Sequence, residues 1–391
     1  MPDVEVSPVS VSAPGGVTPE QGIGLCLSGG GYRAMLFHVG VILRLGELGY
    51  LGTSHRTGKH GPLGRLQRVS SVSGGSIAAA RLGLAWDNLN VDDPGLPDRL
   101  HEHLLEPIQA FASQTTISIV SGLFSAIFGS INGRVTKVYR KRLYGDATLQ
   151  KLPESPRFVI NATNLQSGAL WRFSRQYTWD YRVGKRANPR DLIASAVGAS
   201  SAFPPFLSPA RFEYKESEYE PNTGQDLQFP RYTTRPVLSD GGVYDNMGLE
   251  TVYKRYQTVL VSDAGGAYDS RMKVPTNWAT QSYRVLNTID NQVRSLRKRV
   301  LIANYDKQRR FGAYWSINGD ISKYPAPKTL PCPLDRTQAL AGIATDLAKK
   351  DRTTQRRLIN WGYAICDAGI RGWVEDGLSH PEDFPFPQEK V

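Results

Sequence analysis

The sequence has few of the residues that build a metal centre or a disulfide framework. It contains three cysteines and six histidines in 391 residues. The cysteines, Cys26, Cys332 and Cys366, show no ligand spacing, and an odd number of them cannot all pair. We therefore expect free thiols and a reducing compartment. Cys26 lies in an apolar, strand-like run, which favours a packed thiol over a reactive one.

Long apolar runs are also missing. No stretch reaches the length that a membrane-spanning helix requires. The first 21 residues have neither a basic nor an apolar segment, so no secretory signal is visible. Their content of Pro, Ser, Val and Gly predicts a flexible tail over residues 1–21. We expect a cytoplasmic protein that reaches membranes only peripherally, at their inner face.

Positive charge outweighs negative charge. The net charge is +11, and basic residues gather at 294–299 and again at 307–310. This balance favours an acidic partner, either an anionic membrane surface or a nucleic acid. A basic surface without any such partner is an equally simple interpretation.

Short apolar strands that end in glycine turns indicate a parallel sheet. Residues 22–27 and 69–72 each form such a run, and a helical pattern follows each turn. A strand, a tight turn and a helix, occurring twice, form the βα unit of a parallel sheet. No linker divides the chain, so we expect one α/β domain over residues 22–391 with a helical C-terminal extension from about residue 266.

The first turn contains Gly29, Gly30, Gly31 and Arg33. It matches the dinucleotide fingerprint G-x-G-x-x-A, but no acidic residue ends a second strand about twenty residues later. A phosphate loop is excluded because no Gly-Lys-Ser/Thr follows. Alternatively, the backbone amides of consecutive glycines converge at a helix N-terminus and form an oxyanion hole. Arg33 would then hold the loop or meet an anionic group.

The second turn, Ser71-Val72-Ser73-Gly74-Gly75, supplies a candidate nucleophile. A serine on a tight strand-to-helix turn, with Gly74 and Gly75 beside it, has the mechanics of the nucleophile elbow G-x-S-x-G. Ser71 stands where that motif has its first glycine. Other hydroxyls compete nearby, but only Ser73 lies between the end of the strand and the start of the helix. An ordinary Ser-Gly turn is the simpler alternative.

A base for Ser73 has few candidates. No histidine follows a predicted strand late in the chain, where a Ser-Asp-His order requires one. His38 lies in the first buried helix, where we expect a hydrogen-bonded core residue. Asp240 follows the apolar residues 237–238 and precedes two glycines. A dyad in which Asp240 takes the serine proton is chemically sufficient, although Asp-Gly pairs also form ordinary turns.

Taken in order, the three turns resemble the patatin-like phospholipase family, whose pattern is G-G-G-x-R/K, then G-x-S-x-G, then D-G-G or D-G-A. The matching segments are residues 29–33, 71–75 and 240–242. Residues 159–164 resemble the family's central strand, and residues 194–206 resemble its A-S-x-A-x-P-x-x-F segment. The likeness covers roughly residues 22–265, and Ser71 is its one clear departure.

The resemblance implies a three-layer α/β/α sandwich around a mostly parallel sheet. It also implies a lipid acyl hydrolase in which Ser73 carries the acyl group, Asp240 is the general base and residues 29–31 form the oxyanion hole. The substrate would be a phospholipid or lysophospholipid. A serine–aspartate mechanism needs neither a cofactor nor a metal, so calcium-independent activity is expected.

Two alternatives stay open. The same enzyme could be an effector that a partner or a nucleotide signal switches on, with a sensor in residues 211–235 or in the C-terminal helices. A catalytically weak protein that binds a membrane or a nucleic acid is the other, and it is disfavoured because all three catalytic elements are present. The apolar residues 117–131, together with the basic clusters, would recruit the protein to anionic membranes, although a buried core helix fits that stretch equally well.

Overall fold

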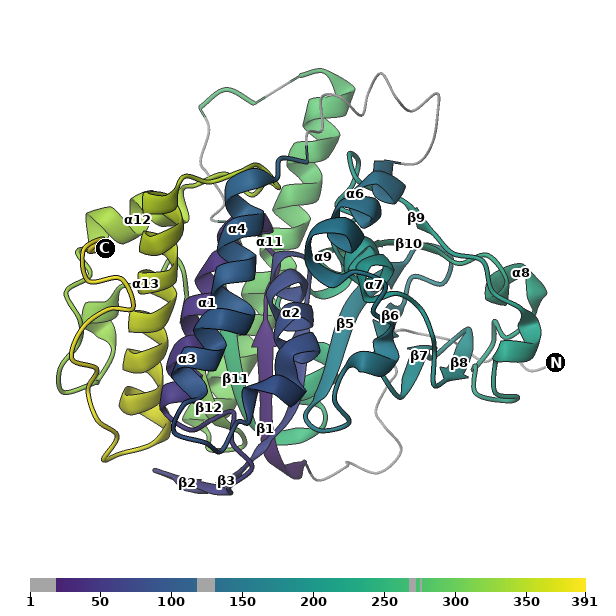
Figure 1. The fold of residues 1–391 in the computed structure, drawn as a ribbon. Coiled ribbons are helices and arrows are strands. Elements are labelled where there is room, and N and C mark those ends of the chain that lie inside the picture. Colours follow the sequence, from purple (N-terminus) through teal and green to yellow (C-terminus); the bar gives the residue numbers. More distant parts are fainter. Residues whose placement is uncertain (1–18, 118–130, 267–271, 275) are drawn as a thin grey trace.

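The computed structural model describes residues 19–117, 131–266, 272–274 and 276–391 (Figure 1). Two expectations therefore concern segments that lie almost wholly outside the described residues. These are the flexible tail over residues 1–21 and the membrane-facing or buried helix over residues 117–131.

The described residues form a mixed α/β fold around a ten-stranded sheet (Figure 1). The central strands run parallel to one another in the order β12-β11-β1-β4-β5, and antiparallel strands extend the sheet beyond β5. The parallel strands are β1 (Glu20–Leu27), β4 (Leu66–Ser71), β5 (Arg157–Asn164), β11 (Tyr256–Asp263) and β12 (Phe311–Ser316). The antiparallel strands are β6 (Leu170–Phe173), β7 (Tyr177–Asp180), β8 (Gly184–Ala187), β9 (Ala210–Arg211) and β10 (Val237–Asp240). A separate hairpin is formed by β2 (Arg56–Gly58) and β3 (Gly61–Gly64).

Helices cover both faces of the sheet, which confirms the expected α/β/α layering. In Figure 1, α1 (Gly31–Glu47), α2 (Gly74–Leu89) and α13 (Arg352–Gly369) lie in front of the sheet, and α11 (Trp278–Asp306) lies behind it. The shorter helices are α3 (Leu96–Leu100), α4 (Glu106–Gln114), α6 (Ile131–Tyr139), α7 (Ile193–Ser200), α8 (Pro230–Thr233), α9 (Gly242–Asp245), α10 (Glu250–Tyr253) and α12 (Leu334–Ala341).

The two faces of the sheet have separate cores because side chains alternate along a strand. In β1, Leu25 and Leu27 pack into the larger core, under α1 and α2, while Cys26 packs into a smaller core with Leu301 of α11. Cys26 is fully buried, and burial raises the pKa of its thiol well above the ordinary value. The expectation of a packed rather than a reactive thiol is confirmed.

Helix α1 is buried along almost its whole length, as the dense apolar pattern predicts. It packs against α13 at a very short distance. A Cβ atom at Gly40 would lie 1.9 Å from the carbonyl oxygen of Ile359, and one at Gly362 would lie 1.9 Å from that of Phe37. The two glycines therefore let the backbones of the two helices pack in direct contact.

The part of the chain after about residue 266 is mostly helical, but it also contributes β12 to the edge of the sheet. The sequence analysis missed this strand, because six residues give too short a pattern to separate a strand from helical surroundings. Among the described residues, none of the helices combines the length and the hydropathy needed to cross a bilayer.

Candidate active site

The first two glycine turns lie next to each other at the carboxyl ends of two central strands. Strands β1 and β4 are parallel neighbours, and their last residues, Leu27 and Ser71, are paired. The residues that follow, the glycine turn and Ser73, therefore emerge side by side at the carboxyl ends of the strands, where parallel sheets place their functional loops.

The third turn reaches the same place from the opposite direction. Strand β4 pairs in parallel with the first half of β5, up to Ile160. Strand β10 pairs antiparallel with the second half of β5, so that Asp240 lies opposite Ala162. Since β6 occupies the other edge of β5, β4 and β10 run head-on along one edge. Their carboxyl ends converge, which brings Ser73 and Asp240 together.

Ser73 is held in a backbone conformation that side chains rarely adopt. It caps the N-terminus of α2 with φ 49° and ψ −118°, a strained region for any residue other than glycine. The turn closes only because its neighbours lack side chains. A Cβ at Gly74 would lie 2.1 Å from the carbonyl oxygen of Gly31, and one at Gly75 would lie 2.4 Å from that of Leu27. This is the geometry of a nucleophile elbow.

A chain of buried hydroxyls supports the strained residue. The amide of Ser73 donates to Ser200 Oγ at 2.9 Å, and Ser200 Oγ lies 2.9 Å from Ser76 Oγ. Ser76 donates to Ser71 Oγ at 3.0 Å, and Ser71 donates to the carbonyl oxygen of Val159 at 3.3 Å. Each hydroxyl has one hydrogen, so Ser200 must donate to Ser76. Ser71, the departure from the family pattern, therefore connects the elbow to β5.

The first turn presents backbone donors toward the same point. Gly30 has φ 145° and Gly31 has φ 62°, conformations that glycine adopts without strain. Neither amide has a hydrogen-bond acceptor among the residues that the structure describes. Both lie at the N-terminus of α1, where unpaired N–H groups carry partial positive charge. They can donate to an anion at this position.

The other two predicted members of the oxyanion hole have different contacts. The Gly29 amide donates to the carbonyl oxygen of Asn246 at 3.0 Å. Arg33 is buried, and its guanidinium donates to three backbone carbonyls at 2.6–3.0 Å, those of Ala264, Ala341 and Ile343. Arg33 thus holds the loop, the first of the two roles that the sequence suggested, and the candidate oxyanion donors narrow to Gly30 and Gly31.

The Asp240 carboxyl is almost completely buried, and only one of its two oxygens accepts a hydrogen bond from the described residues. Its Oδ1 accepts from the Gly242 amide at 2.7 Å. No donor among the described residues meets hydrogen-bond geometry at Oδ2, although the Ser73 hydroxyl lies close enough to lower the pKa of the carboxyl. Burial is the larger effect and raises the pKa of Asp240 to about 7. A carboxyl with this pKa exchanges a proton readily near neutral pH.

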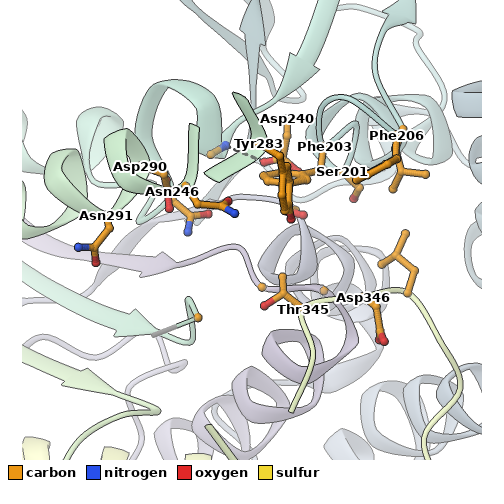
Figure 2. A pocket seen from close by; sticks show the side chains of 18 of the residues that line it. Ser201, Phe203, Phe206, Asp240, Asn246, Tyr283, Asp290, Asn291, Thr345 and Asp346 are labelled. Carbon is orange, nitrogen blue, oxygen red and sulfur yellow. Dashed lines mark hydrogen bonds between the residues drawn. The ribbon is translucent and has the colours of Figure 1, made fainter. Parts of the chain in front are cut away.

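These groups open into a cavity of about 430 Å³ (Figure 2). One side of it is aromatic. Tyr283 of α11 makes edge-to-face contacts with Phe203 and Phe206, with ring centroids 6.3 and 5.9 Å apart. Ser73, Gly30, Gly31 and Asp240 line the floor beside this cluster. An apolar chain therefore fits next to the candidate nucleophile.

The opposite side is polar, and one face of α11 supplies much of it. Figure 2 shows Asp290 and Asn291 on the side of Asp240 away from Phe206, with Asn246 near them. Burial raises the pKa of Asp290 to about 6, against the lowering effect of Arg294. Among the described residues, no group of three or more His, Cys, Asp or Glu side chains could hold a metal ion.

Several of these residues had no signal in the sequence. The Asn246 side chain packs closely against two of the turns, since Cβ atoms at Gly29 and Gly242 would lie 2.3 and 2.8 Å from its Oδ1. His38, by contrast, is a core residue as predicted. Its ring nitrogens lie 2.9 Å from Ser262 Oγ and 3.0 Å from the Ser28 carbonyl oxygen, and burial lowers its pKa to about 4.

Comparison with known proteins agrees with this architecture. The sequence profile of the patatin-like phospholipase family matches residues 25–253, more than half of the chain. Human GIVD cytosolic phospholipase A2 has a similar fold, with a TM-score of 0.50 and 12% identity over 91% of this chain and 61% of that one. VipD from Legionella pneumophila aligns with a TM-score of 0.31 and 16% identity over 88% and 66% of the two chains. The chain thus spans less than two thirds of either protein. No curated protein sequence matches it.

Proposed function

The chain belongs to the patatin-like phospholipase family, and we propose that it is a lipid acyl hydrolase that cleaves fatty-acyl esters of phospholipids or lysophospholipids. Family membership supports lipid hydrolysis in general. The observation that carries the specific proposal is the convergence of β4 and β10 along one edge of β5. Here a strained serine lies beside a buried carboxyl, one oxygen of which accepts no hydrogen bond from the described residues.

In the first half of the proposed reaction, Ser73 Oγ attacks the ester carbonyl while its proton passes to Asp240. The negative charge that develops on the carbonyl oxygen is stabilised by the amides of Gly30 and Gly31. When the tetrahedral intermediate collapses, the bond to the leaving alcohol breaks and that oxygen takes the proton from Asp240. The acyl group stays on Ser73.

In the second half, a water molecule replaces the alcohol. Asp240 accepts its proton, the resulting hydroxide attacks the acyl carbon, and the fatty acid leaves as the proton returns to Ser73. Backbone amides stabilise the oxyanion and the Asp240 carboxylate takes up the proton. No step needs a metal ion, so we expect activity without calcium.

The cavity supports an acyl substrate in particular. The aromatic cluster of Phe203, Phe206 and Tyr283 offers an apolar surface beside Ser73, and a fatty-acyl chain gains free energy by leaving water for such a surface. We propose action at an anionic membrane face that is reached from the cytoplasm. The buried free thiols at Cys26, Cys332 and Cys366 support a reducing compartment.

The test is fatty-acid release from vesicles of mixed zwitterionic and anionic phospholipids, comparing the wild type with Ser73→Ala. We expect release from the wild type and a loss of at least about a thousandfold in the variant. Equal release from both proteins would refute Ser73 as the nucleophile, and no release from either would refute an enzyme active without a partner.

A further inference from the structure

Helix α11 turns mostly polar side chains inward as far as Arg294, the reverse of a typical surface helix, although Leu301 farther along packs into the smaller core. One face lines the cavity with polar side chains, among them Thr280, Asn287, Asp290, Asn291 and Arg294. A surface helix normally turns its polar side chains toward water and its apolar ones toward the protein. Here the polar side faces inward, so the outward side requires an explanation.

The outward face carries a narrow stripe of large apolar side chains. They recur every seven or four residues, which at 3.6 residues per turn places them within about 60° of one another and about 180° from the cavity-lining face. Each is more than half exposed, from 52% at Val285 to 82% at Trp278. The stripe consists of Trp278, Val285, Ile289, Leu296 and Val300.

Several large apolar side chains exposed in one line on a helix signal a contact surface, whereas single ones do not. In Figure 1 the N-terminal turns of α11 rise beyond the ends of α1, α2 and α4, and the stripe on the helix is exposed among the described residues. The question is which partner covers it.

The charges on and beside the helix indicate which kind of partner covers the stripe. The only acidic residues of α11 are Asp290, which lines the cavity, and Asp306, its last residue. Of the basic residues of α11, Arg294 and Arg297 are engaged by buried carboxylates. Lys298 lies over the Tyr314 ring on the inner side of the helix. Arg299, next to Val300, stays exposed beside the stripe. Lys307 and Arg309, which follow the helix, are exposed as well. A second copy of this chain, which is equally basic, would bring like charges together.

We propose that the outer face of α11, from Trp278 to Val300, docks on the surface of an anionic lipid bilayer. An amphipathic helix with tryptophan and aliphatic residues on one face and cations beside them is suited to the headgroup boundary. Anionic lipids attract each nearby cation, with an effect that salt screens. The inference rests on the proposed function in one respect. Because the opposite face of α11 lines the cavity, docking would hold the candidate active site at the membrane that supplies its substrate.

Binding is measured by vesicle flotation in a Ser73→Ala background, so that lipid is not consumed. The vesicles contain phosphatidylcholine alone or an equal mixture of phosphatidylcholine and phosphatidylglycerol. The test variant is Ile289→Gln with Leu296→Gln. The matched control is Leu165→Gln with Leu334→Gln, two leucines that are 51% and 40% exposed outside the stripe and the cavity. Exposed positions tolerate such changes without unfolding.

We expect the anionic vesicles to be preferred, and partitioning onto them to fall about tenfold or more in the test variant, because the apolar area buried at the lipid boundary is lost. The control should stay within about twofold of the parent, and high salt should weaken binding by the parent. Equal binding by both double variants would overturn the proposal. So would a dimer in light scattering that the test variant dissociates, because a second copy would then be what covers the stripe.

A soluble short-chain ester separates this inference from the proposed function. With Ser73 restored, both double variants should hydrolyse the ester at the wild-type rate, because the stripe does not touch the cavity. Selective loss of vesicle binding in a chain that cannot hydrolyse the ester would uphold the docking surface and refute the enzyme. Intact hydrolysis with unchanged vesicle binding would refute the docking surface alone.

Discussion

Two aspartates of this molecule have the same local structure and opposite chemistry. Asp240 ends β10 and Asp263 ends β11, and both are buried. Each accepts a hydrogen bond from the amide two residues later, at 2.7 Å from Gly242 and 2.9 Å from Gly265. Viewed within their turns, the two carboxyls are interchangeable.

Their surroundings make the difference. The second oxygen of Asp263 accepts from the Tyr314 hydroxyl at 2.7 Å and lies 3.8 Å from Arg294 Nε. These partners outweigh the cost of burial and lower its pKa. No cation among the described residues forms an ion pair with Asp240, so burial, aided by the charge of Asp290, raises its pKa to about 7. The local turn therefore does not determine whether a carboxyl can act as a general base. A buried carboxyl becomes a base when it lacks partners that fix its charge.

The largest expected effect of the comparison is on catalysis. Asp240→Asn should lower kcat for ester hydrolysis by about a thousandfold or more, because the amide cannot accept the Ser73 proton. Asp263→Asn should retain far more activity, since that carboxyl is already committed to Arg294 and Tyr314. Steady-state kinetics on a soluble ester measures both. Similar losses in the two variants would erase the distinction.

The two asparagine variants should change the free energy of unfolding in opposite directions. The raised pKa of Asp240 means that the folded state favours the protonated form, so the wild type loses stability as pH rises from about 4 to 7. Asp240→Asn should avoid this loss and gain on the order of 4 kcal/mol at most above pH 7. Asp263→Asn should lose about 3 kcal/mol at neutral pH by removing the carboxylate that pairs with Arg294, a loss that shrinks at acid pH. Urea unfolding at several pH values tests both signs.

The pH dependence of the rate follows from the same pKa. Since Asp240 must be ionised to accept a proton, kcat/KM should rise about tenfold per pH unit below neutrality and level off above an apparent pKa near 7. A profile already flat at pH 5 would show that the base titrates near the usual value of a carboxyl, and would contradict an Asp240 whose pKa is raised by burial.

The smallest effects should come from the hydroxyl chain that aligns Ser73 with Asp240. Ser200→Ala removes the acceptor of the Ser73 amide, so we expect kcat to fall about tenfold with little change in KM. Ser71→Gly restores the family residue but breaks the chain farther from Ser73, so a loss of only a fewfold is expected. The control is Ser174→Ala, which removes a buried hydroxyl bonded to the Tyr177 carbonyl, outside the cavity. If it lowers kcat equally, the chain has no special role.

The sequence predicts those parts of the site that rest on local structure. The turns after β1 and β4 each combine a strand, glycines and a helix within a few residues, and such patterns are visible in one chain. The environment of Asp263 could not be predicted in this way, because its partners Arg294 and Tyr314 lie on elements that are distant in the sequence. Asn246 and Asp290 were missed for the same reason, whereas β12 was missed because its six residues give too short a pattern. The predicted basic cluster at 294–299 was also only partly a surface feature, because Arg294 and Arg297 pair with buried carboxylates.

The most direct test of Ser73 as nucleophile is covalent labelling with an alkyl fluorophosphonate, followed by mass spectrometry of the intact protein and its peptides. We predict one adduct per chain, located on Ser73, absent from Ser73→Ala and formed far more slowly in Asp240→Asn. An adduct on another serine, or equal labelling of the wild type and Ser73→Ala, would contradict the assignment.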